Sequence, residues 1–138
     1  MRDSYGEVLV KASFKPALRA ATANGTAVDR VDGTNASMYQ DAMVVINSGV
    51  VTDGTHTLTI EDSDDNSSWA TVAAGFLEGD TPPALITTND DTVYETRYTG
   101  GKRYLRVVTT VTGSPSTGGL YSAEVVLSNP RRGAVVHP

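Results

Sequence analysis

Residues 56–61 read His-Thr-Leu-Thr-Ile-Glu, and this short stretch decides the fold class. Leu58 and Ile60 lie on one face of an extended chain, while the threonines and the glutamate lie on the other. An alternation with a period of two residues is typical of a β-strand that is buried on one side. The stretch therefore predicts a half-buried strand, and the same pattern can be sought along the rest of the chain.

The pattern recurs on both sides of this stretch. Residues 42–46, 92–99, 104–112 and 120–128 alternate in the same way and are rich in β-branched and aromatic residues. The expected core positions are Ala42, Val44, Ile46, Leu58, Ile60, Leu105, Val107, Val111, Tyr121, Ala123, Val125 and Leu127, and Tyr94 and Tyr98 share one side of their strand. Turn residues separate the segments, as at Asp53-Gly54. We predict an all-β protein of seven or eight short strands, a single antiparallel β-sandwich that is jelly-roll-like, or alternatively a small barrel.

The two ends of the chain are expected to be extended arms. Residues 1–25 are predicted to form an N-terminal arm, 26–128 the sandwich domain and 129–138 a C-terminal tail. Pro16 interrupts any helix near the start, and Pro130 cannot donate to a β-ladder, so the last strand is expected to end by Ser128. Frayed termini are the alternative for either arm. Residues 71–77 fit a helical turn or a short strand equally well.

Composition excludes several classes of partner and site. The chain of 138 residues fits one domain, and it contains no cysteine for a disulfide or a thiolate metal site. No apolar run approaches the length of a membrane span, so no membrane partner is expected. The net charge of −5 argues against nucleic acid as a partner, because phosphate contacts need a continuous basic surface.

The charges are segregated along the sequence. Residues 31–96 hold twelve acids and no base, so all eleven lysines and arginines lie outside this stretch. This layout suits a protein that presents one face to solvent and holds a partner with another. The densest basic segment is 101–108, where Tyr104 and Arg106 share a face. It is either a charged edge strand or a contact with an acidic neighbour.

A metal site has one weak candidate. Asp62, Asp64 and Asn66 have the 1-3-5 spacing of a calcium loop, but Ser67 replaces the required glycine and Ala73 the closing glutamate. We therefore expect no metal, and the alternative interpretation is a solvated turn whose side chains cap their own backbone.

Catalysis has little support in the sequence. The only histidines are His56, expected at an edge or on the surface, and His137 near the C-terminus. Neither stands in a pattern that activates a nucleophile, and no phosphate-binding loop is present. We predict that the chain is not an enzyme and has no cofactor. Trp69 is expected at the rim of the core, with a sugar-stacking platform as the alternative.

Several phrases of the sequence resemble a known group of proteins. Residues 93–98, 101–108, 117–119 and 125–131, together with 57–65, resemble small structural proteins of tailed bacteriophages, namely capsid decoration or cement proteins. The resemblance covers residues 25–132 and includes no catalytic motif. It implies a β-rich virion protein on the outer capsid surface, with the major capsid protein as partner. It also implies a homo-oligomer, which we expect to be a trimer.

Candidate contact residues with the capsid or a second subunit are mostly basic. They are Lys11, Phe14, Lys15, Leu18, Arg19, Arg97, Lys102, Arg103, Arg106, Arg131 and Arg132. The basic ends are expected to meet an acidic capsid surface. In an oligomer, Arg97 to Arg106 would meet the Asp62–Asp65 turn of the next subunit. A head-spike, neck or tail component and a carbohydrate-binding module remain the alternatives.

Overall fold

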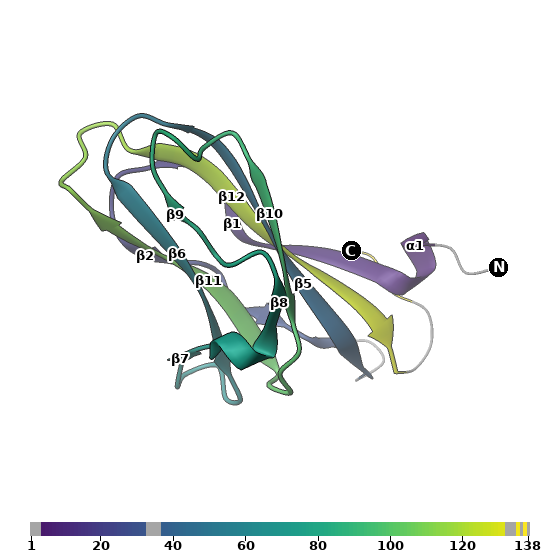
Figure 1. Ribbon diagram of the computed structural model, residues 1–138. Helices are drawn as coiled ribbons and strands as arrows, with labels where there is room; N and C mark the ends of the chain where they lie inside the picture. The colour runs from purple at the N-terminus through teal and green to yellow at the C-terminus, as the bar shows by residue number, and fades with distance from the viewer. Residues whose placement is uncertain (1–3, 33–36, 132–134, 136, 138) are drawn as a thin grey trace.

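The computed structural model describes residues 4–32, 37–131, 135 and 137, and most of them lie in two antiparallel β-sheets that face each other (Figure 1). The first sheet has the order β1-β12-β5-β10-β8, and β4 pairs with β5 beside this path. Its strands are β1 (Val8–Arg19), β12 (Gly119–Pro130), β5 (Ser37–Val51), β10 (Val93–Tyr98), β8 (Leu77–Gly79) and β4 (Val31–Asp32). The predicted all-β sandwich is confirmed.

The second sheet has the order β2-β11-β6-β7, with β3 paired to β11 and β9 paired to β6. Its strands are β2 (Ala23–Asn24), β11 (Tyr104–Thr112), β6 (Thr55–Ser63), β7 (Ala70–Thr71), β3 (Val28–Asp29) and β9 (Ala84–Leu85). The described residues also form two short helices, α1 (Ser4–Glu7) and the 3-10 turn η1 (Ala74–Phe76). The ambiguous segment 71–77 therefore contains the end of a strand, a 3-10 turn and the first residue of β8.

The connections between strands follow a jelly roll. Eight of the described strands, taken in chain order, are β1, β2, β5, β6, β7, β10, β11 and β12. Numbered from first to eighth, they form sheets of order 1-8-3-6 and 2-7-4-5, which is the jelly-roll arrangement. Neighbouring strands of each sheet therefore come from distant parts of the chain, as β1 and β12 show.

The core lies between the sheets and uses the predicted faces. Leu58 and Ile60 of β6 are buried opposite the inward side chains of β5 and β12. Nearly all the expected positions are buried, and the exceptions are Val111 and Tyr94, which are half-buried near strand ends. The alternation of the sequence was enough to predict the core residues, because each strand packs one face in the core and exposes the other to solvent.

The predicted N-terminal arm is wrong for residues 8–19. This segment is β1, an edge strand that pairs with β12 from Val8 opposite Ser128 to Arg19 opposite Gly119. Leu9 and Phe14 are buried in the core. The prediction failed because two register shifts, between Ala12 and Phe14 and between Phe14 and Ala17, interrupt the alternation. Deletion of residues 1–20 is therefore expected to damage the sandwich itself.

The C-terminal boundary also differs from the prediction. Strand β12 continues to Pro130, which lies opposite Tyr39, rather than ending by Ser128. A proline is tolerated there because it is the last residue of the strand and its carbonyl can still accept. Beyond it, Val135 is buried and its N–H donates to the carbonyl of Gly6 over 3.0 Å. This residue of the expected tail thus packs against the N-terminal region.

Candidate interaction surface

The outer face of the second sheet has the chemistry of an ordinary solvent-exposed sheet. Thr55, Thr57 and Thr59 point outward from β6 and are half-buried. Beside them, Arg106 of β11 pairs with Glu61 of β6, with 2.6 Å between Nη2 and Oε2. Short β-branched polar residues and a cross-strand ion pair stabilise a sheet without needing a partner on that side.

The outer face of the first sheet is different, because valine and methionine replace threonine. Val10 of β1, Val126 of β12 and Met43 of β5 lie in register across three neighbouring strands. Val10 is 56% exposed. The apolar face, as we name it, consists of Val8, Val10, Met43, Val45, Val93 and Val126. Neighbouring apolar side chains on the outer face of a sheet make this face the candidate interaction surface.

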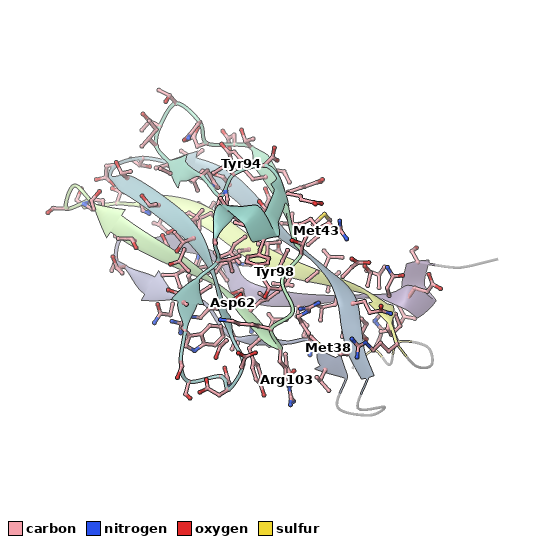
Figure 2. The ribbon with its side chains drawn as sticks, turned by 60° about the horizontal axis from the view of Figure 1, so that its bottom comes forward. Met38, Met43, Asp62, Tyr94, Tyr98 and Arg103 are labelled. Atoms are coloured by element: carbon pink, nitrogen blue, oxygen red, sulfur yellow. The ribbon has the colours of Figure 1, made fainter. Side chains whose placement is uncertain are left out.

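An open depression of about 360 Å³ lies on the apolar face. Val8, Met43 and Val126 contribute its apolar lining; Met43 is labelled in Figure 2. Asp41 and Arg97 line its polar end, and Arg97 Nη2 lies 2.9 Å from Asp41 Oδ1. The depression therefore combines apolar walls with one fixed ion pair.

A second apolar group lies farther along the same sheet. Leu18 of β1 pairs with Leu120 of β12, and both are exposed. Val50, near the end of β5, is also exposed. Leu18 was a candidate contact residue and is available for that role.

Phe14 is not available as a contact residue, which corrects the sequence prediction. Its side chain is buried in the core at the edge of the ring of Tyr121. Arg19 covers it, with the guanidinium carbon 4.5 Å from the ring centroid. Arg19 also donates to the carbonyls of Tyr121 and Lys15 over 2.8 and 2.7 Å, so it holds β1 in place.

Other predicted contact cations have acidic partners in the same chain. Lys102 Nζ lies 2.9 Å from Asp62 Oδ1, and Arg103 donates to both oxygens of Asp29 over 2.8 Å. Strand β11 is interior to its sheet, so edge protection does not explain the basic segment. The acids that pair with this segment belong to the same chain, whereas the sequence alternative was an acidic partner. The predicted contact with the next subunit thus loses its simplest basis.

Asp29 shows how strongly these charges are used internally. Burial raises the pKa of its carboxyl, but hydrogen bonds from Arg103 and Val31 and the charges of Arg103 and Lys11 outweigh that effect. The pKa of Asp29 is therefore below its usual value. Lys11 lies opposite the buried Val125 in the register of β1 and β12, so it is on the inward face of β1 rather than on the apolar face.

The remaining basic candidates lie near the ends. Lys15 sits in the bulged part of β1 and is exposed. Arg131 is also exposed, and its N–H donates to the carbonyl of Met38. Arg132 lies outside the residues that the structure describes.

The candidate calcium loop is organised by its own side chains. Asp62 is buried and accepts from the hydroxyl of Tyr98 over 2.8 Å, and these two residues are labelled in Figure 2. Asp65 accepts from the N–H groups of Ser68 and Ser67 over 2.7 and 2.9 Å, and these bonds hold its pKa well below the usual range. This is the self-capped turn of the alternative interpretation.

Asp64 and Asn66, the other two predicted ligands, are exposed. Among the described residues, no group of three histidine, cysteine or acidic side chains could hold a metal ion.

His56 is fully buried, which corrects its expected place at an edge or on the surface. Its Nε2 lies 3.1 Å from the carbonyl of Asp53, so that nitrogen carries the proton. Its Nδ1 lies 3.2 Å from the hydroxyl of Tyr121, and Thr109 bonds the same hydroxyl over 2.8 Å. The prediction failed because β6 is interior to the sheet from its first residues.

Trp69 is half-buried, and the guanidinium of Arg106 lies 4.3 Å from its ring centroid. One face of the ring is therefore covered by a cation. This agrees with a position at the rim of the core and leaves less of the ring for a sugar to stack on.

Arg30 has a structural role that no sequence pattern indicated. Its side chain is only 2% exposed and donates to four backbone carbonyls. Nη1 reaches Gly100 and Lys102 over 3.1 and 2.8 Å, and Nη2 reaches Tyr39 and Gln40 over 3.1 and 3.0 Å. Burial lowers the pKa of this guanidinium. Arg30 joins β5 to the loop before β11. No local sequence pattern predicts such a contact.

Comparison of the sequence with protein-family models and with curated proteins gave no match. No helix in the described part of the chain is long and apolar enough to span a membrane.

Proposed function

We propose that this chain is a non-enzymatic structural protein of a tailed-phage virion that binds the outer surface of the capsid and reinforces it. The apolar face is the single observation that carries a binding role. The resemblance of the sequence to phage capsid decoration proteins suggests the binding location, with the major capsid protein as partner. Jelly rolls occur in viral capsid proteins and in lectins, so the fold is compatible with this role without selecting it.

Binding fits the geometry better than catalysis does. His56 is enclosed and bonded at both ring nitrogens. The depression on the apolar face is open and ends in the ion pair between Asp41 and Arg97. Such a pair fixes both charges, whereas acid–base catalysis needs a group free to exchange a proton with a substrate. The surface is therefore suited to holding a partner.

The turn at Asp53 is held to the loop before β12, which favours an ordered end of the sandwich. The carboxylate of Asp53 accepts from the N–H groups of Ser116, Thr117 and Gly118, and these bonds lower its pKa. A surface that is ordered before binding loses little entropy on docking. In a homo-oligomer, linked copies that bind one shell together would add avidity to each modest contact.

The test is the copy number and position of the chain on purified particles. We expect hundreds of copies on the capsid surface, by quantitative mass spectrometry and by density in cryo-electron microscopy. About a dozen copies or fewer at a vertex, neck or tail would replace decoration with one of those roles. Symmetry of the density also tests the expected trimer, and single bound monomers would refute it. Specific binding on a glycan array would favour the carbohydrate-binding alternative.

A matched pair of variants tests the surface. Val126→Glu places a charge in the middle of the apolar face, and Thr59→Glu places one on the outer face of the second sheet. We expect Val126→Glu to lose capsid occupancy and Thr59→Glu to keep it, with both folded by circular dichroism. Equal occupancy of the two variants would show that the apolar face is not the contact.

A further inference from the structure

The apolar face carries excess negative charge. Glu124 of β12, Val45 of β5 and Glu95 of β10 lie in register, one row from Val126 and Met43. Strands in a sheet are about 4.8 Å apart, so the two glutamates stand about 10 Å apart across Val45. Within the part of the chain that the structure describes, neither glutamate forms an ion pair.

The nearest base on this face is already shared between two acids. Arg97 Nη2 lies 2.9 Å from Asp41 and Nη1 lies 2.9 Å from Glu78. These two contacts leave one negative charge uncompensated, and Glu95 and Glu124 add two more. Lys11 lies opposite the buried Val125 and so is on the inward face of β1, and Lys15 lies in the bulge of β1 beyond Ala12. The face is therefore apolar at its centre and acidic around it.

We propose that the partner of the apolar face presents apolar side chains flanked by lysine or arginine, and that this partner is the capsid protein rather than a second copy of this chain. Docking removes water from the glutamates, and a desolvated carboxylate needs a cation or a hydrogen-bond donor. A second copy placed face to face would bring the same acids together, which is unfavourable. The inference rests on the proposed function and reverses the expectation that a basic surface meets an acidic capsid.

Charge reversal on the face tests the proposal. Glu95→Lys, Glu124→Lys and the double variant are compared with Asp64→Lys, which makes the same change at an exposed turn of the second sheet. The probe is phage particles prepared without the chain, at a fixed protein concentration. We expect the double variant to bind about tenfold more weakly, from two lost attractions and two new repulsions. Asp64→Lys should bind like the unmodified protein.

Carbodiimide cross-linking of the unmodified protein on particles identifies the partner directly, because the reagent joins carboxylates to neighbouring lysines. We expect Glu95 or Glu124 to be joined to lysines of the capsid protein. Joining to Lys11, Lys15 or Lys102 of a second copy would overturn the choice of partner. Unchanged binding of the double variant would overturn the charge assignment while leaving capsid binding intact. If the unmodified protein does not bind particles, the proposed function fails, and this inference fails with it.

Discussion

Among the basic residues that the structure describes, Arg30 is expected to be the most damaging to replace by alanine. The guanidinium is almost fully buried and its two terminal nitrogens donate to four carbonyls, on β5 and on the loop before β11. Arg30 also bonds through its backbone, donating to Arg103 and accepting from Tyr39. The backbone bonds survive in Arg30→Ala, whereas all four side-chain bonds are lost.

The expected loss of stability follows from the four carbonyl oxygens that Arg30→Ala leaves without their donor. A hydrogen bond to a charged group contributes about 1.5–3 kcal/mol, so four bonds set an upper limit near 6–12 kcal/mol. Three of the four bonds are only partly buried, and water can replace the donor there. Removing the buried cation also relieves its desolvation, which offsets part of the loss. We expect a decrease of about 3–5 kcal/mol in the free energy of unfolding, a large share of the ~5–15 kcal/mol typical of a domain.

Urea unfolding followed by the fluorescence of Trp69 measures this loss. Arg103→Ala is the control, because it removes an exposed ion pair with Asp29 and should cost about 1 kcal/mol or less. Arg30→Lys keeps the charge but not the planar fork, so its loss should lie between the two. A loss below about 1 kcal/mol for Arg30→Ala would refute the reasoning, because the carbonyls would then be satisfied without the guanidinium.

Three further predictions concern a turn, a buried phenol and metal dependence. Gly118 has a φ of +93°, and a Cβ there would overlap the carbonyl oxygen of Arg19, so Gly118→Ala should cost at least about 2 kcal/mol in thermal unfolding. Gly101→Ala, where a Cβ meets nothing within 4 Å, should cost little. Burial raises the pKa of Tyr98 from 10.0 to about 12, so its contribution to stability is complete below pH 10 and is lost as the pH rises toward 12. Tyr98→Phe should weaken this alkaline loss in pH-dependent unfolding, and an unchanged profile would contradict the assignment. EDTA should leave the melting temperature unchanged, and a fall that calcium alone reverses would reveal a calcium site.

The role of each basic residue is the clearest limit of sequence reasoning here. Lys102, Arg103 and Arg106 were expected to contact a partner, and each pairs with an acid of its own chain. Those acids are far away in the sequence. Arg103 and Asp29 are separated by 74 positions, and Arg106 and Glu61 by 45. The charges are segregated along the sequence, but the antiparallel pairing of β11 with β6 brings Lys102 and Arg106 to acids of that stretch, and its pairing with β3 brings Arg103 to Asp29.

The sequence by itself determined the fold class and most of the core, because the period-two alternation depends only on which residues prefer a dry face. It also determined that the loop at Asp62 lacks the glycine and glutamate of a calcium site. Only the tertiary structure decided that β1 closes the first sheet, that His56 and Arg30 are buried, and that the outer face of that sheet is apolar and acidic. These features depend on which strands become neighbours. A jelly roll joins strands that are far apart in the chain, so no local pattern contains that information.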